Sequence, residues 1–80
     1  MKNSNERKET SELRTIRIED EKFSYTMVRR QTGKKVQWYP IYNDKRFSRT
    51  LFSSKWEAQR FVIDLVTANG IAKVNEIFTK

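Results

Sequence analysis

The chain has 80 residues, no histidine and no cysteine, and 17 Lys and Arg against 10 Asp and Glu, a net charge of +7. This length allows one small domain. Without cysteine or histidine, a Cys/His zinc site, a disulfide framework, a cysteine nucleophile and a Ser-His-Asp triad are excluded. No apolar run reaches the roughly 18 residues of a membrane span, and no signal peptide is visible at the N-terminus. We therefore expect a cytoplasmic protein with no membrane span.

The N-terminal segment is polar throughout. The first ten residues read MKNSNERKET and contain no apolar residue after Met1. Such a segment has nothing to bury. The sequence predicts a disordered tail over residues 1–12 and a single α+β domain over residues 13–80.

Two alternating segments come next. Residues 14–19 place Ile16 and Ile18 on one face, which is the period of a β-strand. The polar residues 20–22 suit a turn. Residues 23–29 alternate again and are rich in aromatic and β-branched side chains, which favours a second strand.

Two further strands are predicted after a glycine turn. Gly33 supplies the positive φ that a tight hairpin needs. In the third strand, residues 36–42, Pro40 cannot donate a ladder hydrogen bond and should lie at an edge or bulge. Trp38 and Tyr39 must point to opposite faces, and we place Trp38 in the core and Tyr39, with Ile41, on the open face. Asn and Asp at residues 43–44 indicate a turn before a fourth strand over residues 46–52.

A helix is clearly marked over residues 55–69. Ser54 and Glu57 have the spacing of a capping box. Gly70 has the left-handed position that ends many helices. The amphipathic stripe consists of Ala58, Phe61, Val62, Leu65 and Val66.

The last segment, residues 71–80, fits both a short helix and a strand. We favour the strand, because so few residues after a glycine turn are marginal for a second helix. The predicted fold class is α+β: a small antiparallel sheet of three to four strands with one amphipathic helix packed on one face, and a C-terminal strand if the tail is extended. The other sheet face has nothing left to cover it.

The excess charge lies in the middle of the chain. Residues 22–60 hold ten Lys and Arg against two Asp and Glu, and eight of the ten aromatic residues. A basic segment interleaved with aromatics is typical of a surface that meets phosphates and bases. The candidate nucleic-acid-binding residues are Arg17, Arg29, Arg30, Lys34, Lys35, Tyr39, Lys45, Arg46 and Arg49. We expect Arg17, Arg29 and Arg49 on the sheet face and the others mainly at two hairpin turns.

One stretch carries a pattern that runs from Trp38-x-Pro40 through Phe52-Ser53-Ser54-x-x-Glu57-Ala58-x-x-Phe61. It resembles the three-stranded-sheet-plus-helix DNA-binding domains of plant AP2-type factors and of the N-termini of phage-type integrases, over about residues 23–68. The resemblance implies a sheet that lies in the major groove, with Arg and Trp side chains on it contacting DNA. The chain departs from the pattern by an added first strand, an apolar tail and Pro40 within the third strand.

The sequence therefore predicts a small non-enzymatic nucleic-acid-binding protein, with DNA favoured over RNA and no cofactor or metal. No catalytic constellation is visible, and the acidic run 19–21 is interpreted as a solvated turn rather than a metal site. The alternative is a protein–protein interaction module (an adaptor, inhibitor or assembly subunit) that docks on an acidic partner surface. Its contact surface would comprise Tyr39, Ile41, Ile77 and Phe78. A free sheet edge is compatible with a homodimer.

Overall fold

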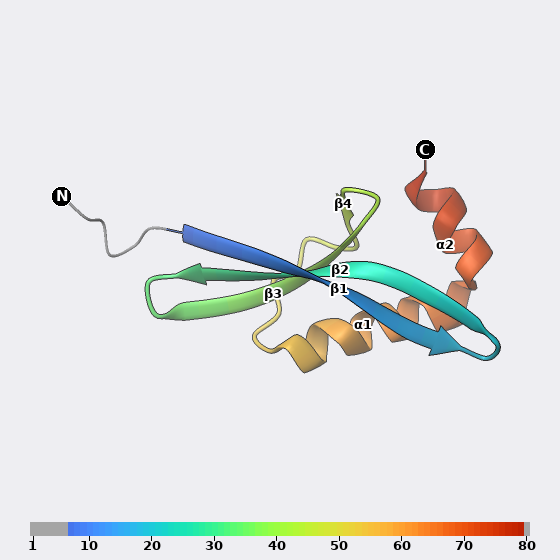
Figure 1. The fold of residues 1–80 in the computed structure, drawn as a ribbon, viewed down its shortest axis with the longest axis horizontal. Coiled ribbons are helices and arrows are strands. Elements are labelled where there is room, and N and C mark those ends of the chain that lie inside the picture. The colour runs from blue at the N-terminus through green and yellow to red at the C-terminus, as the bar shows by residue number, and fades with distance from the viewer. Residues whose placement is uncertain (1–6, 80) are drawn as a thin grey trace.

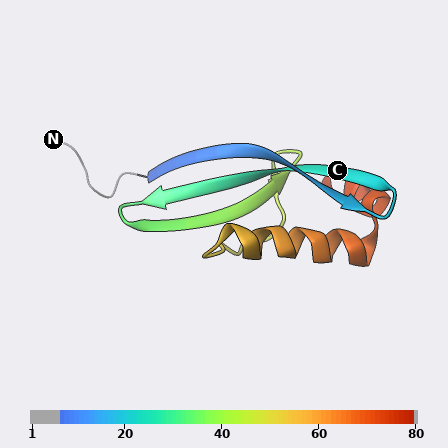
Figure 2. The ribbon, with the colours of Figure 1, turned by 60° about the horizontal axis from the view of Figure 1, so that its bottom comes forward.

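One antiparallel sheet and two helices make up the fold. The computed structural model describes residues 7–79. The sheet has the order β1-β2-β3-β4, and helix α1 lies along one of its faces (Figures 1 and 2). The elements are β1 Arg7–Ile18, β2 Glu21–Thr32, β3 Lys35–Tyr42, β4 Lys45–Arg46, α1 Lys55–Asn69 and α2 Ile71–Phe78. The predicted α+β class, with a helix packed on an antiparallel sheet, is confirmed.

Tight turns set the register of the sheet. β1 pairs with β2 along its whole length, from Arg7↔Thr32 to Ile18↔Glu21. Gly33, between β2 and β3, has φ 62°, and the central residues of the β3–β4 turn have φ 55° and 64°. Two successive positive φ values are what a type I′ hairpin requires, and Asn and Asp tolerate them. The predicted turns at Gly33 and at residues 43–44 are therefore confirmed. The first turn covers residues 19–20 and not the predicted 20–22, since β2 begins at Glu21.

The ends of α1 follow the predicted signals. The Ser54 hydroxyl accepts a hydrogen bond from the Glu57 backbone N–H at 3.1 Å. Gly70 has φ 90°, and its N–H donates to the Val66 carbonyl at 2.7 Å. The cap and the glycine together fix the helix at the predicted bounds, residues 55–69.

The core lies between α1, α2 and one face of the sheet, which we call the helix face. Its buried members are Ile16, Phe23, Tyr25, Met27, Ala58, Val62, Val66, Val74 and Phe78. Trp38 packs against this cluster, as predicted. The hydroxyl of Tyr25 is buried without a hydrogen-bond partner in the described chain, and burial raises its pKa.

The favoured C-terminal strand is wrong: residues 71–78 form α2. The Gly70 carbonyl accepts a hydrogen bond from the Val74 N–H at 3.1 Å, so α2 starts directly where α1 ends. The Phe78 ring then packs 4.9 Å from that of Phe47. Tertiary packing thus stabilises a helix that is too short to be stable alone. Neither helix of the described chain is long and apolar enough to cross a membrane.

The predicted fourth strand, residues 46–52, is wrong beyond Arg46. A regular ladder would need the backbone N–H that Pro40 lacks. The Phe47 N–H still donates to the Pro40 carbonyl at 3.3 Å, but the chain then leaves β3. It returns at Phe52, which exchanges two 2.8 Å hydrogen bonds with Trp38, and the intervening residues form a loop. β3 lies between β2 and β4 and Pro40 pairs with Met27, so Pro40 is not at an edge or bulge as predicted; it stands where the short β3–β4 ladder ends.

The predicted disordered tail is also wrong where the structure describes it. Residues 7–12 are part of β1 and pair with β2, while residues 1–6 lie outside the described residues. Local composition offers no apolar surface here, but the backbone of β2 provides hydrogen-bonding partners along its full length. Cross-strand pairs such as Glu9↔Arg30 add to this stabilisation.

The packing of α2 generates a stability prediction. Phe78 is 8% exposed within the aromatic cluster, whereas its neighbour Ile77 is 50% exposed. Phe78→Ala should lower the free energy of unfolding by about 3 kcal/mol, because it removes a buried ring. Ile77→Ala should lower it by less than about 1 kcal/mol. Urea denaturation of both variants measures the difference; equal losses would contradict the helical tail.

Candidate nucleic-acid interface

The continuous register divides the strand residues between two faces. Partners across an antiparallel pair share a face, and neighbours along a strand alternate. Ile16 and Phe23 are partners in the core, so Arg17 and its partner Lys22 lie on the opposite side, which we call the open face. Tyr39 and Ile41 are on the open face too, because they pair with Val28 and Thr26. Their predicted placement is thus confirmed.

The open face is strongly basic. Glu9 is the one acidic residue among the described strand positions that point there. The basic residues on this face are Arg7, Arg17, Lys22, Arg30, Lys35 and Arg46. On the helix face, by contrast, acids such as Glu12 and Glu21 stand among the bases. The sheet therefore presents one surface of nearly uniform sign.

An arginine–tyrosine–arginine stack occupies the centre of the open face. The guanidinium carbons of Arg30 and Arg46 lie 5.2 Å and 4.5 Å from the centre of the Tyr39 ring. Both distances are within the range of a cation–π contact. The two guanidinium groups cover the ring, and Tyr39 is only 9% exposed. The groups presented to solvent here are the arginines.

Glu9 anchors one side of this stack. Its Oε2 accepts hydrogen bonds from Arg30 Nε at 2.9 Å and from the Tyr39 hydroxyl at 3.1 Å. The Arg30 hydrogen bond holds the pKa of the Glu9 carboxyl below its usual range, and the same bond raises the pKa of Arg30. Arg30 is therefore partly neutralised. Arg46 has no carboxylate partner within residues 7–79; it donates to the Arg49 carbonyl at 3.2 Å.

A shallow hollow lies beside the stack. It has a volume of about 330 Å³ and is lined by Glu9, Thr10, Ser11, Thr26, Val28, Tyr39 and Ile41. Leu13, on the same face and the partner of Thr26, is 74% exposed. The open face thus combines cationic groups with a small apolar area.

Five of the nine predicted residues share the open face. They are Arg17, Arg30, Lys35, Tyr39 and Arg46. The other four lie elsewhere: Arg29 on the helix face, Lys34 in the β2–β3 turn, Lys45 opposite Tyr42 on the helix face, and Arg49 in the loop after β4.

The expected role of Arg29 as a contact on the open face is wrong. It follows Met27 at strand spacing and therefore shares the core side. There it lines a separate hollow of about 180 Å³ with Trp38 and Lys55. The Trp that the family resemblance places against DNA is likewise on the helix face.

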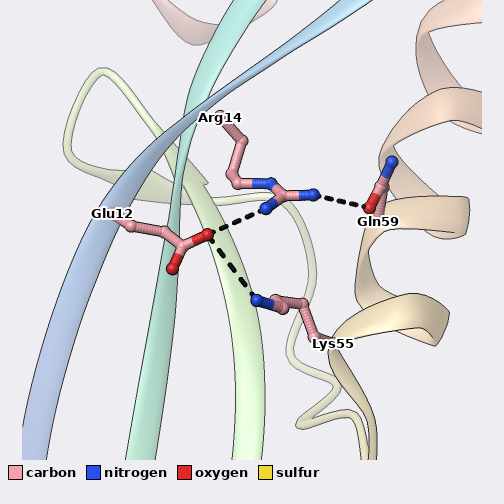
Figure 3. A network of polar contacts seen from close by, with 4 residues as sticks. All are labelled: Glu12, Arg14, Lys55 and Gln59. Atoms are coloured by element: carbon pink, nitrogen blue, oxygen red, sulfur yellow. Dashed lines mark hydrogen bonds and ion pairs between the residues drawn. The ribbon is translucent and has the colours of Figure 1, made fainter.

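A polar network ties β1 to α1 on the helix face (Figure 3). Arg14 donates to Gln59 Oε1 at 3.0 Å and to Glu12 Oε2 at 2.9 Å. Lys55 Nζ lies 3.8 Å from the same Glu12 oxygen. These charges join the helix to the sheet and are directed away from the open face.

Sequence reasoning missed Arg7, Lys22 and the anchoring role of Glu9. Residues 7–9 were assigned to the tail, and without a pairing partner their face was undefined. Strand alternation alone could have found Lys22, since it stands one position before the core residue Phe23.

The surface predicted for the alternative function is split. Tyr39 and Ile41 are on the open face, whereas Phe78 is buried in the core and Ile77 lies on α2. The acidic run 19–21 spans the β1–β2 turn and the start of β2. Residues 7–79 contain no group of three or more acidic side chains that could hold a metal.

No protein-family model, no curated protein and no solved structure matches this chain. The likeness to AP2-type and integrase N-terminal domains therefore stays a prediction.

The Glu9 contacts generate a pH prediction. Because the folded state lowers the Glu9 pKa, its contacts stabilise the fold at neutral pH, and that stability is lost as the pH falls below about 4. Arg30→Gln should raise the Glu9 pKa toward its usual range, as followed by NMR of its carboxyl carbon during a pH titration. Arg29→Gln, the neighbour on the other face, should leave it unchanged. Identical titration curves in both variants would refute the assigned contact.

Proposed function

We propose that this protein is a non-enzymatic DNA-binding protein that contacts duplex DNA with the open face of its sheet. The supporting observation is the clustering of Arg7, Arg17, Lys22, Arg30, Lys35 and Arg46 on one face with Glu9 as the acidic residue among them. A patch of one sign attracts the phosphate backbone and releases its counterions on binding.

The shape of the sheet favours duplex DNA over RNA. The end of the sheet that carries the β2–β3 turn extends beyond α1, so the strands there have no helix beneath them (Figure 2). Three strands lie side by side at this end, since Arg7 pairs with Thr32 and Thr32 pairs with Lys35. The major groove of B-DNA is about 12 Å wide and open to protein secondary structure, whereas the major groove of A-form RNA is too deep and narrow for side chains to read. Lys35 is the first residue of β3 at this end. Arg30 is the next residue of β2 on the same face after Thr32, the partner of Lys35.

The residues divide into two roles in this proposal. Lys35, Lys22 and Arg17, toward the two ends of the sheet, contact phosphates and set the orientation of the protein. Arg46 presents a guanidinium fork held by Tyr39, which suits bidentate contact with phosphate or with a guanine edge. Tyr39 acts as the platform beneath the arginines rather than as a base-stacking residue.

The test compares two charge-matched double variants. Lys35→Gln with Arg46→Gln removes two charges from the open face, and Lys8→Gln with Arg29→Gln removes two from the helix face. At about 50 mM salt the open-face variant should bind duplex DNA at least about tenfold more weakly, and its salt slope should fall by about 2. The helix-face variant should change affinity by less than about threefold. Fluorescence anisotropy over a salt series measures both quantities.

Three outcomes would overturn the proposal. Equal losses in the two variants would mean that only net charge matters. Tighter binding to single strands or RNA than to duplex DNA would reassign the ligand. Absence of binding to any nucleic acid would favour the alternative, an interaction module for an acidic protein surface.

A further inference from the structure

We propose that β1 is a homodimer interface, through which two copies pair their free sheet edges antiparallel around a twofold axis at Leu13. β1 has β2 on one side, and no described strand on the other. The strand is 12 residues long, and residues 7–13 are all exposed. An edge of this length is a ready template for another strand. The inference goes beyond DNA binding and does not depend on it.

The backbone of Leu13 is oriented for this pairing. The N–H and C=O of Trp38 bond to Phe52 on the outer side of β3, so they point away from β2. Arg29 is the β2 partner of Trp38, and its own N–H and C=O must therefore point away from β3, toward β1. Arg29 pairs with Thr10. The N–H and C=O of Thr10 therefore face β2. Because this direction alternates from residue to residue along a strand, the N–H and C=O of Leu13, three residues on, face the free edge.

The side chains of β1 are self-complementary in this register. Leu13 meets Leu13 of the second copy at the axis, and Glu12 meets Arg14 of the second copy on the helix face. On the open face, Glu9 meets Arg17 of the second copy. The twofold axis repeats each ion pair, and opposite charges directly across strands are stabilising.

Neighbouring registers lack this match. An axis at Glu12 would place the two Glu12 side chains opposite each other, and an axis at Arg14 would do the same to the two arginines. An axis at Ser11 would oppose Lys8 and Arg14. Like charges directly across a pair are destabilising, so the sequence favours the register centred on Leu13.

Two features of the single chain support this interface. Leu13 is the most exposed of the large apolar residues within residues 7–79, at 74%. Arg17 lies opposite Lys22 with no carboxylate partner for either in the described chain, and like charges in this position repel. Pairing would bury the leucine and bring the Glu9 carboxylate of the second copy beside Arg17.

The first experiment measures association without nucleic acid. Analytical ultracentrifugation of the full chain, up to about 1 mM, should show a monomer–dimer equilibrium. Leu13→Lys should raise the dissociation constant at least about tenfold, because it places two like charges at the axis. Ile77→Lys, which adds the same charge at an exposed leucine-sized residue on α2, should leave the constant unchanged. A monomer at all concentrations, or a dimer unaffected by Leu13→Lys, would overturn the proposal.

The second experiment tests the register, using the absence of native cysteine. Leu13→Cys should form an intermolecular disulfide on mild oxidation, because paired Cα atoms lie about 5.5 Å apart, within disulfide range. Thr15→Cys should not, since the two sites would be four residue positions out of register, about 13 Å. Cross-linking of Thr15→Cys as readily as Leu13→Cys would indicate a parallel or shifted pairing and would refute the proposed axis.

Discussion

The register of β2 is the constraint on which the surface of this protein depends. β2 pairs with β1 on one side and β3 on the other, and each pairing is continuous where it occurs. Successive residues alternate between faces, so Met27 enters the core while Val28 and Arg30 go to the open face. A slip of one residue would move the basic side chains into the core and the aromatic ones into water. Burial of Phe23, Tyr25 and Met27 therefore also determines where the charge lies.

Much of the fold was predictable because local chemistry decides it. The cap at Ser54, the glycines at 33 and 70 and the turn residues Asn43 and Asp44 each satisfy a backbone requirement within a few residues. Alternation likewise placed Trp38 and Tyr39 on opposite faces. These features need no knowledge of distant segments.

The errors arose where a distant partner decides the structure. Residues 7–12 are extended because β2 offers them a register, and α2 is helical because Phe78 packs on Phe47. The fourth strand ends early because Pro40, on the neighbouring strand, cannot donate a hydrogen bond. For the candidate site, the composition located the basic segment and alternation from Met27 separates Arg30 from Arg29, but only the pairing places Arg7 and Glu9 on the open face.

The open face also shows why its charge and its aromatic residue occur together. A chain of this size has no second layer for that face, yet Tyr39 and Val28 lie on it. The guanidinium groups of Arg30 and Arg46 lie over the ring and cover it. The groups that shield the ring from water are therefore cationic, and the same two guanidinium groups can bind anions.

The proposed dimer and the proposed DNA contact reinforce each other. A twofold axis perpendicular to the sheet leaves both open faces on the same side, so the basic surface doubles in length. Glu9, which pairs with Arg30 within one chain, would also face Arg17 of the second copy, so each carboxylate would lie beside two guanidinium groups and the interface would keep a net positive charge. DNA bound by such a pair would meet two copies of one surface related by twofold symmetry, so its preferred site would be a palindrome.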